Sequence, residues 1–467
     1  MAIVKAKKPH VLVVPFPVQG HVRPLMKLSR QIAKHGIKVT FVSIQTIHEK
    51  LLAAAKLSKD EEKVDLEEDN IVMTSIPDGR RPEDDPNDSF ILLESLRDSM
   101  PRSLTDLIEM INSSNPDEKI SCVIMDVTIE WLSETAEKMG AEPVIFMPAS
   151  GAGLTMLRHL GRLVDDGSLD SNGSIIRGEK ISVWDDIPAW RVNELTWSIP
   201  FDLTTQKIFF DCALRIEKTI NRIKWLLGNT FYQLEPAACD LNPNFLPIGP
   251  LLEMNRSKSS SSIHPEDTSC LSWLDEKPYG SVVYVSFGSL AVFSQQQLDE
   301  LALGLELSGR PFLWVVRPDL ANGSRAEFPD GFLERVNSLG IGKIVDWAPQ
   351  ERVLSHTSIA CFVSHCGWNS TLEGLSNGVP FLCWPYFSDQ YHNQNYICDQ
   401  WKIGLRIVPD ENGIRSRGEI KTKIEMLFSN DNMKANALKL KELAEESVNE
   451  GGSSYKNFEI FIEHLIK

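Results

Sequence analysis

The chain has 467 residues, 42% of them hydrophobic, and this length exceeds what one ordinary core needs, so two domains are expected. The formal net charge is −16 and no basic stripe appears, which argues against nucleic acid or an anionic membrane surface as a partner. No apolar run approaches the roughly 20 residues that span a bilayer, so membrane insertion is not predicted.

The N-terminus has lysines before an apolar stretch, which superficially resembles a signal peptide. Pro15 and Pro17 interrupt that stretch, and HVLVV is more typical of a buried first strand. The eight cysteines are scattered, and several lie inside apolar strands, which favours reduced thiols over a disulfide framework. A cytoplasmic protein is therefore expected, and a monomer is the expected oligomeric state.

The first half alternates apolar strands with amphipathic segments, a pattern that predicts a parallel sheet covered on both faces. Residues 165–200 are rich in Asp, Gly, Ser and Pro, and irregular segments of this kind often form a substrate entrance. The predicted strands lie at 10–17, 38–44, 70–76, 121–127 and 143–148.

Two polar residues follow strands of this half. His21 comes after the first strand, where a loop becomes a helix, and an imidazole with an ordinary pKa near 6.5 can take a proton at neutral pH. Asp126 ends the strand SCVIMD and would emerge at the same sheet edge, where it could accept the Nδ1–H of His21. Each also has a plainer interpretation as a helix cap.

A Ser-rich segment at about 254–269 predicts a flexible linker, and strand–helix alternation then starts again. Gly288 and Ser289 follow the strand at 281–289, where they suit either a phosphate-side loop or a tight turn. Later strands are predicted at 311–317, 342–349, 360–365 and 380–385, followed by helices.

The segment from Trp347 to Gln390 has the residues needed to hold a nucleotide sugar. Trp347 offers an aromatic face to a base, and the HCGWNS turn from His365 to Ser370 leads from a strand into a helix, whose first N–H groups suit a diphosphate. Glu373 lies one turn beyond Asn369 and could accept ribose hydroxyls. Asp389 and Gln390 add groups that suit a sugar.

This segment strongly resembles the signature box of the plant family 1 UDP-dependent glycosyltransferases, with its WAPQ start, HCGWNS core, Glu373 and final Asp–Gln. PFPVQGHVRP is similar to the family's N-terminal motif, whose histidine, here His21, is the general base. VIMDVTIEWLSETAEKMG resembles the segment that carries the assisting aspartate, here Asp126.

The resemblance implies an α/β fold of GT-B architecture, with two Rossmann-like domains facing across a cleft. The expected domains are an acceptor-binding domain at 1–248, a UDP-sugar-binding domain at 249–450, and a C-terminal helix at 451–467 that packs back on the first domain. It also implies an inverting transfer of glucose from UDP-glucose to a hydroxyl of a small lipophilic metabolite, such as a phenolic, flavonoid or terpenoid, giving a β-glucoside.

The resemblance assigns the donor site residue by residue. By this resemblance, Trp347 stacks on uracil and the Ala348 backbone contacts the uracil edge. Gln350 and Glu373 bind the ribose. The residues expected to bind the phosphates are His365, Gly367, Asn369 and Ser370, with Gly288 and Ser289 nearby. The residues expected to bind the sugar hydroxyls are Trp368, Asp389 and Gln390. A terminal Gln390 is associated with UDP-glucose.

Three further expectations concern the acceptor, the metal and the alternatives. An apolar acceptor lining is expected to include Met147, Trp190 and Phe387. No D-x-D triplet occurs and the HC pair lacks a second metal-ligand pair, so no metal is expected. Another UDP-sugar donor and a non-catalytic UDP-sugar-binding protein stay open, whereas a dinucleotide oxidoreductase is disfavoured because the first strand leads into PVQGHVRP rather than G-x-G-x-x-G.

Overall fold

The computed structural model describes residues 9–57, 70–85, 89–198, 202–253, 262–321 and 323–467. Its contacts divide the chain into two compact units. Unit 1 comprises residues 1–162, 211–265 and 447–467, and unit 2 comprises residues 163–210 and 266–446. Helices α6 (Leu160–Asp165), α7 (Leu203–Arg222) and α16 (Asp431–Val448) begin in one unit and end in the other.

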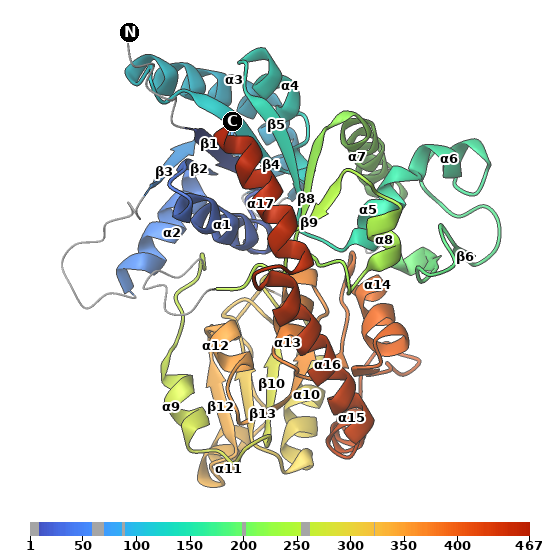
Figure 1. Cartoon of the computed structure of the whole chain (residues 1–467). Helices are drawn as coiled ribbons and strands as arrows, with labels where there is room; N and C mark the ends of the chain where they lie inside the picture. The colour runs from blue at the N-terminus through green and yellow to red at the C-terminus, as the bar shows by residue number, and fades with distance from the viewer. Residues whose placement is uncertain (1–8, 58–69, 86–88, 199–201, 254–261, 322) are drawn as a thin grey trace. The chain divides into compact units, whose positions relative to one another are not determined.

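Unit 1 is built on a seven-stranded parallel sheet of order β3-β2-β1-β4-β5-β8-β9 (Figure 1). Its strands are β1 (His10–Val14), β2 (Lys38–Ile44), β3 (Ile71–Ile76), β4 (Ile120–Asp126), β5 (Glu142–Met147), β8 (Trp225–Gly228) and β9 (Phe245–Pro247). Its remaining helices are α1 (Gln19–Lys34), α2 (Gln45–Leu57), α3 (Ser89–Ser114), the 3-10 turn η1 (Val127–Ile129), α4 (Leu132–Lys138), α5 (Gly151–Arg158), α8 (Pro236–Asp240) and α17 (Ser453–Ile466).

Unit 2 is built on a six-stranded parallel sheet of order β12-β11-β10-β13-β14-β15. Its strands are β10 (Val282–Ser286), β11 (Phe312–Val315), β12 (Gly342–Val345), β13 (Ile359–Ser364), β14 (Phe381–Cys383) and β15 (Gly404–Arg406), with a separate antiparallel pair, β6 (Lys180–Ile181) and β7 (Trp190–Arg191). Its helices are η2 (Val192–Glu194), α9 (Ser269–Asp275), α10 (Gln295–Ser308), α11 (Phe332–Ser338), α12 (Gln350–Leu354), α13 (Trp368–Ser376), α14 (Gln390–Asn395), the π-helix η3 (Tyr396–Gln400) and α15 (Arg417–Phe428).

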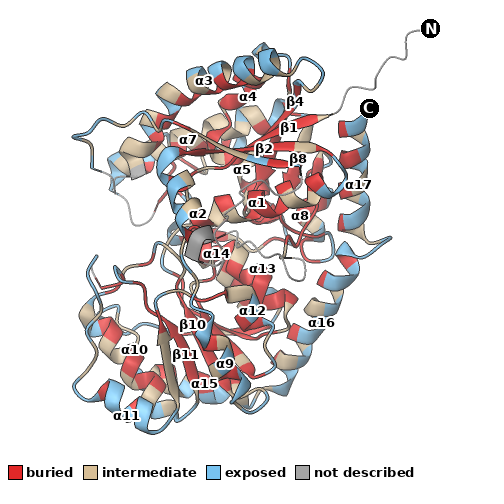
Figure 2. Cartoon of the chain, turned by 90° about the vertical axis from the view of Figure 1, so that its left-hand side faces the viewer, coloured by how far each residue is buried: buried red, intermediate tan, exposed pale blue. Residues whose placement is uncertain are grey.

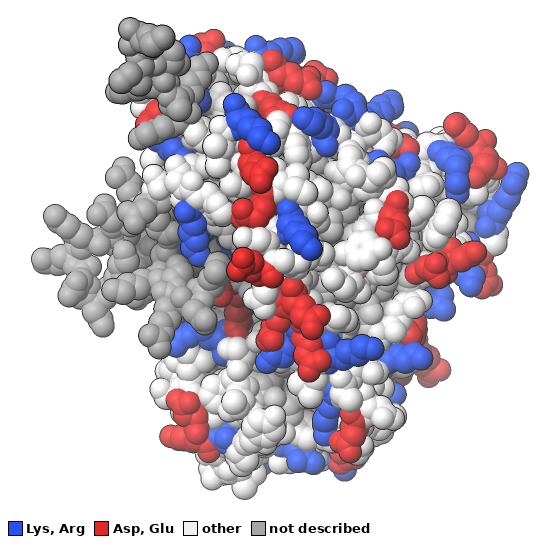
Figure 3. Space-filling model, in the orientation of Figure 1, with Lys and Arg blue, Asp and Glu red and all other residues white. Residues whose placement is uncertain are grey.

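The strands are apolar along most of their length because helices cover both faces of each sheet, so little strand surface meets water. Figure 2 shows this burial, with the strands mostly buried and the helices exposing one face. The α/β class and the two parallel sheets predicted from the alternation are confirmed. On the face that Figure 3 shows, basic side chains are interspersed with acidic ones.

Three segments bear on the predicted domain limits. Residues 163–210 belong to unit 2, whereas the predicted boundary at residue 248 placed them in the first domain. Residues 254–261 of the predicted linker lie outside the described residues, and Ser262 and Ile263 are buried against Gln19. Helix α17 belongs to unit 1, where Phe458 and Phe461 join the hydrophobic core of the seven-stranded sheet.

Candidate active site

The topology of unit 1 brings His21 and Asp126 together. Strands β1 and β4 are neighbours at the point where the strand order of the sheet reverses, and Val14 is paired with Met125. His21 lies in the first turn of α1, directly after β1, and Asp126 ends β4. The reversal point of an open parallel sheet leaves a crevice at the carboxyl ends of its strands, where side chains from both loops converge.

The two side chains form a short hydrogen bond. His21 Nδ1 lies 2.7 Å from Asp126 Oδ2, while Asp126 Oδ1 accepts the backbone N–H of Thr128 at 2.8 Å. Asp126 is fully buried, whereas 27% of the His21 side chain is exposed. A carboxylate can only accept, so Nδ1 carries the proton and Nε2 is the basic nitrogen of this tautomer. The pair therefore has the arrangement of an imidazole base oriented by a carboxylate.

Unit 2 has the same topological arrangement. Strands β10 and β13 are neighbours at its reversal point, and Ser286 is paired with Ser364, so the loops carrying Gly288 and His365 leave the sheet side by side. After β13 the chain turns through Cys366, whose φ is +64°, and Gly367 caps α13. The first turn of α13 therefore lies at this sheet edge, where its backbone N–H groups and positive dipole end favour an anion.

The His365 ring lies between two glycines. A Cβ atom on Gly288 would approach His365 Nε2 to 2.7 Å, and one on Gly367 would approach it to 2.5 Å. Arg317, just after β11, fixes the first glycine loop by donating to the carbonyl oxygens of Gly288 at 2.5 Å and Ala291 at 2.8 Å. Loss of water around the ring, and next the charge of Arg317, lower the pKa of His365 to about 4, so this imidazole is neutral at pH 7.

The residues predicted for the ribose form one hydrogen-bonded group. Gln350 Nε2 donates to Glu373 Oε2 at 2.7 Å and to Ser370 Oγ at 2.8 Å, and Gln350 Oε1 accepts from the Tyr284 hydroxyl at 3.1 Å. Both amide protons of Gln350 are thus used to hold Glu373 and Ser370. Trp347 and Ala348 lie just before α12, with Trp347 partly exposed and Ala348 buried.

The residues predicted for the sugar lie at the start of α14. Gln390 Oε1 accepts the backbone N–H groups of Tyr386 at 2.8 Å and Phe387 at 3.1 Å. These two donors settle the orientation of the amide and turn its NH₂ group away from the loop. Asp389, the residue before α14, is partly exposed, and Trp368 in the first turn of α13 is 3% exposed.

The three residues predicted for the acceptor occupy different places. Met147 is buried at the end of β5, one strand away from Asp126. Trp190 is buried in unit 2, where its ring stacks on His392 at 4.0 Å between centroids. Phe387 is partly exposed in the loop before α14.

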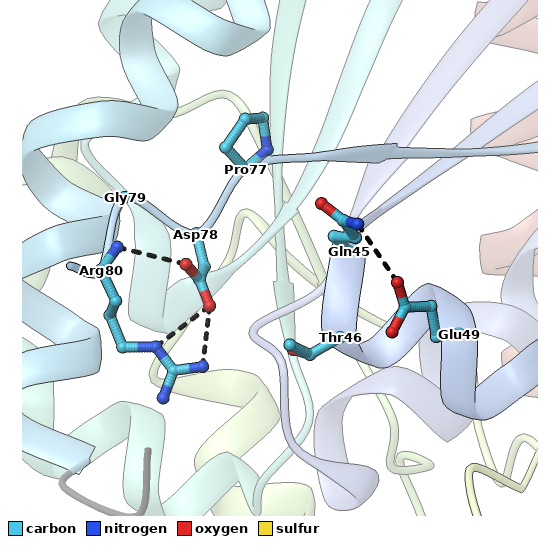
Figure 4. Close-up of a pocket in the computed structure, with 7 residues that line it drawn as sticks. All are labelled: Gln45, Thr46, Glu49, Pro77, Asp78, Gly79 and Arg80. Atoms are coloured by element: carbon cyan, nitrogen blue, oxygen red, sulfur yellow. Dashed lines mark hydrogen bonds and ion pairs between the residues drawn. The ribbon is translucent and has the colours of Figure 1, made fainter. Parts of the chain in front are cut away.

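A cavity lies at the ends of β2 and β3 (Figure 4). Its volume is about 300 Å³, and its hydrogen bonds join Gln45 to Glu49 at 3.1 Å and the Arg80 side chain to Asp78 at 2.7 and 3.0 Å. Every charged side chain of the lining thus has an internal partner. The lining residues are Gln45, Thr46, Glu49, Pro77, Asp78, Gly79 and Arg80.

Comparisons with known proteins match both units to one enzyme family. Residues 238–448 match the family described as UDP-glucoronosyl and UDP-glucosyl transferase, and residues 8–158 match the glycosyltransferase N-terminal domain. UDP-glycosyltransferase 83A1 of Arabidopsis thaliana is 41% identical over 465 residues, covering 97% of this chain and 96% of that protein. The chain belongs to the plant family 1 UDP-glycosyltransferases.

Solved structures of this family have the same fold. A Polygonum tinctorium UDP-glucosyltransferase capable of glucosylating indoxyl superposes with a TM-score of 0.84 at 27% identity, covering 99% of this chain and all of that one. Os79 of O. sativa, in complex with UDP, gives a TM-score of 0.80 at 27% identity over 97% of this chain and all of that one. The chain is thus a UDP-sugar glycosyltransferase of GT-B architecture, and both predictions are confirmed.

Two features of the described residues bear on partners. No described helix has the length and apolarity of a membrane span. Within the described ranges, no three His, Cys, Asp or Glu side chains are grouped as metal ligands would be. Metal independence of the reaction stays a prediction.

Three residues of this glycosyltransferase site were not predicted from the sequence: Tyr284, Arg317 and Asn393, a buried residue of α14 whose Nδ2 donates to Asp389 Oδ2. Tyr284 and Arg317 lie within predicted strands, but their partners come from other parts of the chain. Tyr284 bonds to Gln350 at the start of α12, and Arg317 bonds to the loop after β10. For Arg317 a signal was available, because a cation directly after a buried parallel strand lies at the ligand-binding edge of the sheet.

The buried His392 predicts a specific dependence of stability on pH. Burial lowers its pKa to about 4. The unfolded chain takes up this proton near pH 6.5, so stability is lost as pH falls from 6.5 towards 4, by at most about 1.4 kcal/mol per pH unit for this group. We expect His392→Gln, which keeps a donor for the carbonyl of Pro188, to lose less unfolding free energy than the wild type between pH 7 and pH 5.

Urea unfolding at the two pH values measures this difference. Burial raises the pKa of Glu130 to about 7, which acts in the opposite direction, and His365 acts in the same direction as His392. Both are common to the two proteins and cancel in the comparison. Equal losses in wild type and variant would contradict the assignment to His392.

Proposed function

We propose that this glycosyltransferase moves glucose from UDP-glucose to a hydroxyl of a small, largely lipophilic metabolite, such as a phenolic, flavonoid or terpenoid. His21 takes the proton of the acceptor hydroxyl, and that oxygen attacks the anomeric carbon while the bond to UDP breaks on the opposite face. The configuration inverts, so an α-linked donor gives a β-glucoside. The observation that carries this proposal is the hydrogen bond of 2.7 Å between His21 and the buried Asp126.

Asp126 is proposed to hold the tautomer of His21 and to stabilise the imidazolium that forms. The leaving UDP is proposed to lie against the first turn of α13, with Trp347 on uracil and Glu373 on the ribose. Backbone donors at a helix start favour the charge that develops on a departing diphosphate. The mechanism requires that the acceptor oxygen at His21 reach the anomeric carbon of the sugar held by unit 2.

Two observations support glucose as the donated sugar. The NH₂ group of Gln390 is oriented so that it can donate to a sugar hydroxyl, and the Polygonum tinctorium enzyme with the same fold is a UDP-glucosyltransferase. No metal is proposed, and the working location is the cytoplasm, with the protein acting as a monomer.

The cavity at the ends of β2 and β3 is proposed to receive the remote end of the acceptor. Neighbouring strands lie about 4.8 Å apart, so this cavity is about one to two strand spacings, roughly 5–10 Å, from the carboxyl end of β1, after which the chain leads to His21 in α1. Its carboxylate and amide oxygens accept hydrogen bonds, so acceptors with neutral hydroxyl groups at that end are expected to be preferred over fully apolar ones.

A panel of hydroxylated metabolites incubated with UDP-glucose tests the function, with products analysed by mass and by the anomeric coupling in NMR spectra. Pairs of acceptors that differ only by a hydroxyl at the end remote from the reacting group test the cavity. An α-glucoside, or UDP release without a glucoside for every acceptor, would refute the mechanism.

A further inference from the structure

A buried asparagine links the sugar end of the donor site to the diphosphate turn. Asn393 lies one helical turn after Asp389 and is fully buried. Its Nδ2 group donates to the backbone oxygen of Cys366 at 2.9 Å and to Asp389 Oδ2 at 3.0 Å. Both partners can only accept, so the nitrogen of the amide must face them. One side chain thereby joins a carboxylate predicted for the sugar to the turn predicted for the phosphates.

Helix α14, which carries Asn393, contacts the segment 188–190. His392 Nε2 donates to the carbonyl oxygen of Pro188 at 2.8 Å, and its ring stacks on Trp190 with an interplanar angle of 2°. Both rings are buried. All of these residues belong to unit 2, so the contacts connect α14 to the segment 188–190 within one compact unit.

We propose that Asn393 is a positioning residue that sets where the Asp389 carboxylate lies relative to the diphosphate turn and thereby selects the donor sugar. The proposal rests on the proposed function, in which Asp389 accepts sugar hydroxyls. Epimeric sugars differ in the direction of one hydroxyl, so an acceptor oxygen discriminates between them only if its own position is fixed. Loss of the bond from Asn393 removes one restraint on the Asp389 carboxylate and makes its position relative to either epimer less well defined.

Asn393→Ala is expected to lower kcat/KM for UDP-glucose on the order of 10- to 100-fold, since a small displacement of a positioning contact has effects of this size. The preference for UDP-glucose over UDP-galactose is expected to narrow. The affinity for UDP, which lacks the transferred hexose, is expected to stay unchanged. Calorimetry with UDP and UDP-glucose, and initial rates with both donors, measure these quantities separately.

Asn395→Ala is the matched control. Asn395 is a buried asparagine on the same helix, but its Oδ1 accepts from Arg406 at 2.9 Å, away from the donor residues. We expect Asn395→Ala to keep the donor preference of the wild type. Asn393→Ser, which retains one hydroxyl donor in a smaller side chain, is a second variant and is expected to show a smaller loss in the same direction.

Equal losses of affinity for UDP and UDP-glucose in Asn393→Ala would overturn the proposal, because they would show that Asn393 only supports the fold of the turn. An unchanged donor preference in both Asn393 variants would also overturn it. If the wild type binds UDP-glucose but forms no glucoside, the proposed function fails, while the comparison of the two binding affinities still tests the positioning role.

Discussion

Replacing His21 with alanine is expected to reduce kcat roughly 100- to 10,000-fold, the usual contribution of a general base, and to leave the affinity for UDP unchanged. The base acts on the acceptor hydroxyl, whereas the residues proposed to hold UDP all lie in unit 2. The expected result is therefore a loss in kcat without a loss of UDP binding. Initial rates at saturating UDP-glucose and calorimetry with UDP measure the two effects.

His35→Ala is the control for His21→Ala. His35 follows the last turn of the same helix, α1, and its Nε2 lies 3.9 Å from Glu459. This substitution removes an imidazole from α1 without touching Asp126, so kcat is expected to stay at the wild-type value. A His21→Ala enzyme that retained full turnover would disprove the role of His21 as the base.

Replacing Gly367 with alanine is expected to lower the affinity for UDP roughly 10- to 100-fold, the scale on which displaced binding groups act. The added Cβ would lie 2.5 Å from His365 Nε2, so the ring has to move, and Gly288 is also close to this ring, since a Cβ there would lie 2.7 Å from Nε2. The obstructing atom is the end of a side chain, so the fold is expected to survive. Calorimetry with UDP measures the affinity, and thermal unfolding without ligand measures the stability.

Gly418→Ala is the matched control for this substitution. Gly418 lies in α15, and a Cβ there would have its nearest neighbour at 4.0 Å, so the methyl group fits without displacing anything. Alanine is also the better helix former, so a slightly higher melting temperature with unchanged UDP affinity is expected. Wild-type UDP affinity in Gly367→Ala would refute the placement of the diphosphate beside His365.

Local patterns in the sequence predicted much of this protein. The apolar runs ending at Val14, Asp126, Ser286 and Ser364 are parallel strands. Each strand ends at, or shortly before, a residue whose side chain or backbone can contact a ligand. Strand identity depends on apolar side chains close together in the chain, and helix starts depend on the residues around the cap. Such signals can be recognised in the sequence without knowledge of the tertiary fold.

Local sequence patterns did not predict where the segment 163–210 packs. Its irregular sequence left Trp190 open as an acceptor residue, and its position in the chain suggested the first domain. In the structure this segment packs with unit 2, and the Trp190 ring is buried and stacks on the His392 ring. A contact between residues about 200 positions apart leaves no periodic trace in either segment.

The sequence by itself determined the family, the two-sheet class and the residue types at the strand ends, because these depend on short stretches of chain. Tertiary structure alone decided that His21 bonds to Asp126, that Arg317 holds the Gly288 loop, and that Asn393 joins Asp389 to Cys366. Strand order and helix packing set these partners, and both arise from burial of the whole core rather than from local preference.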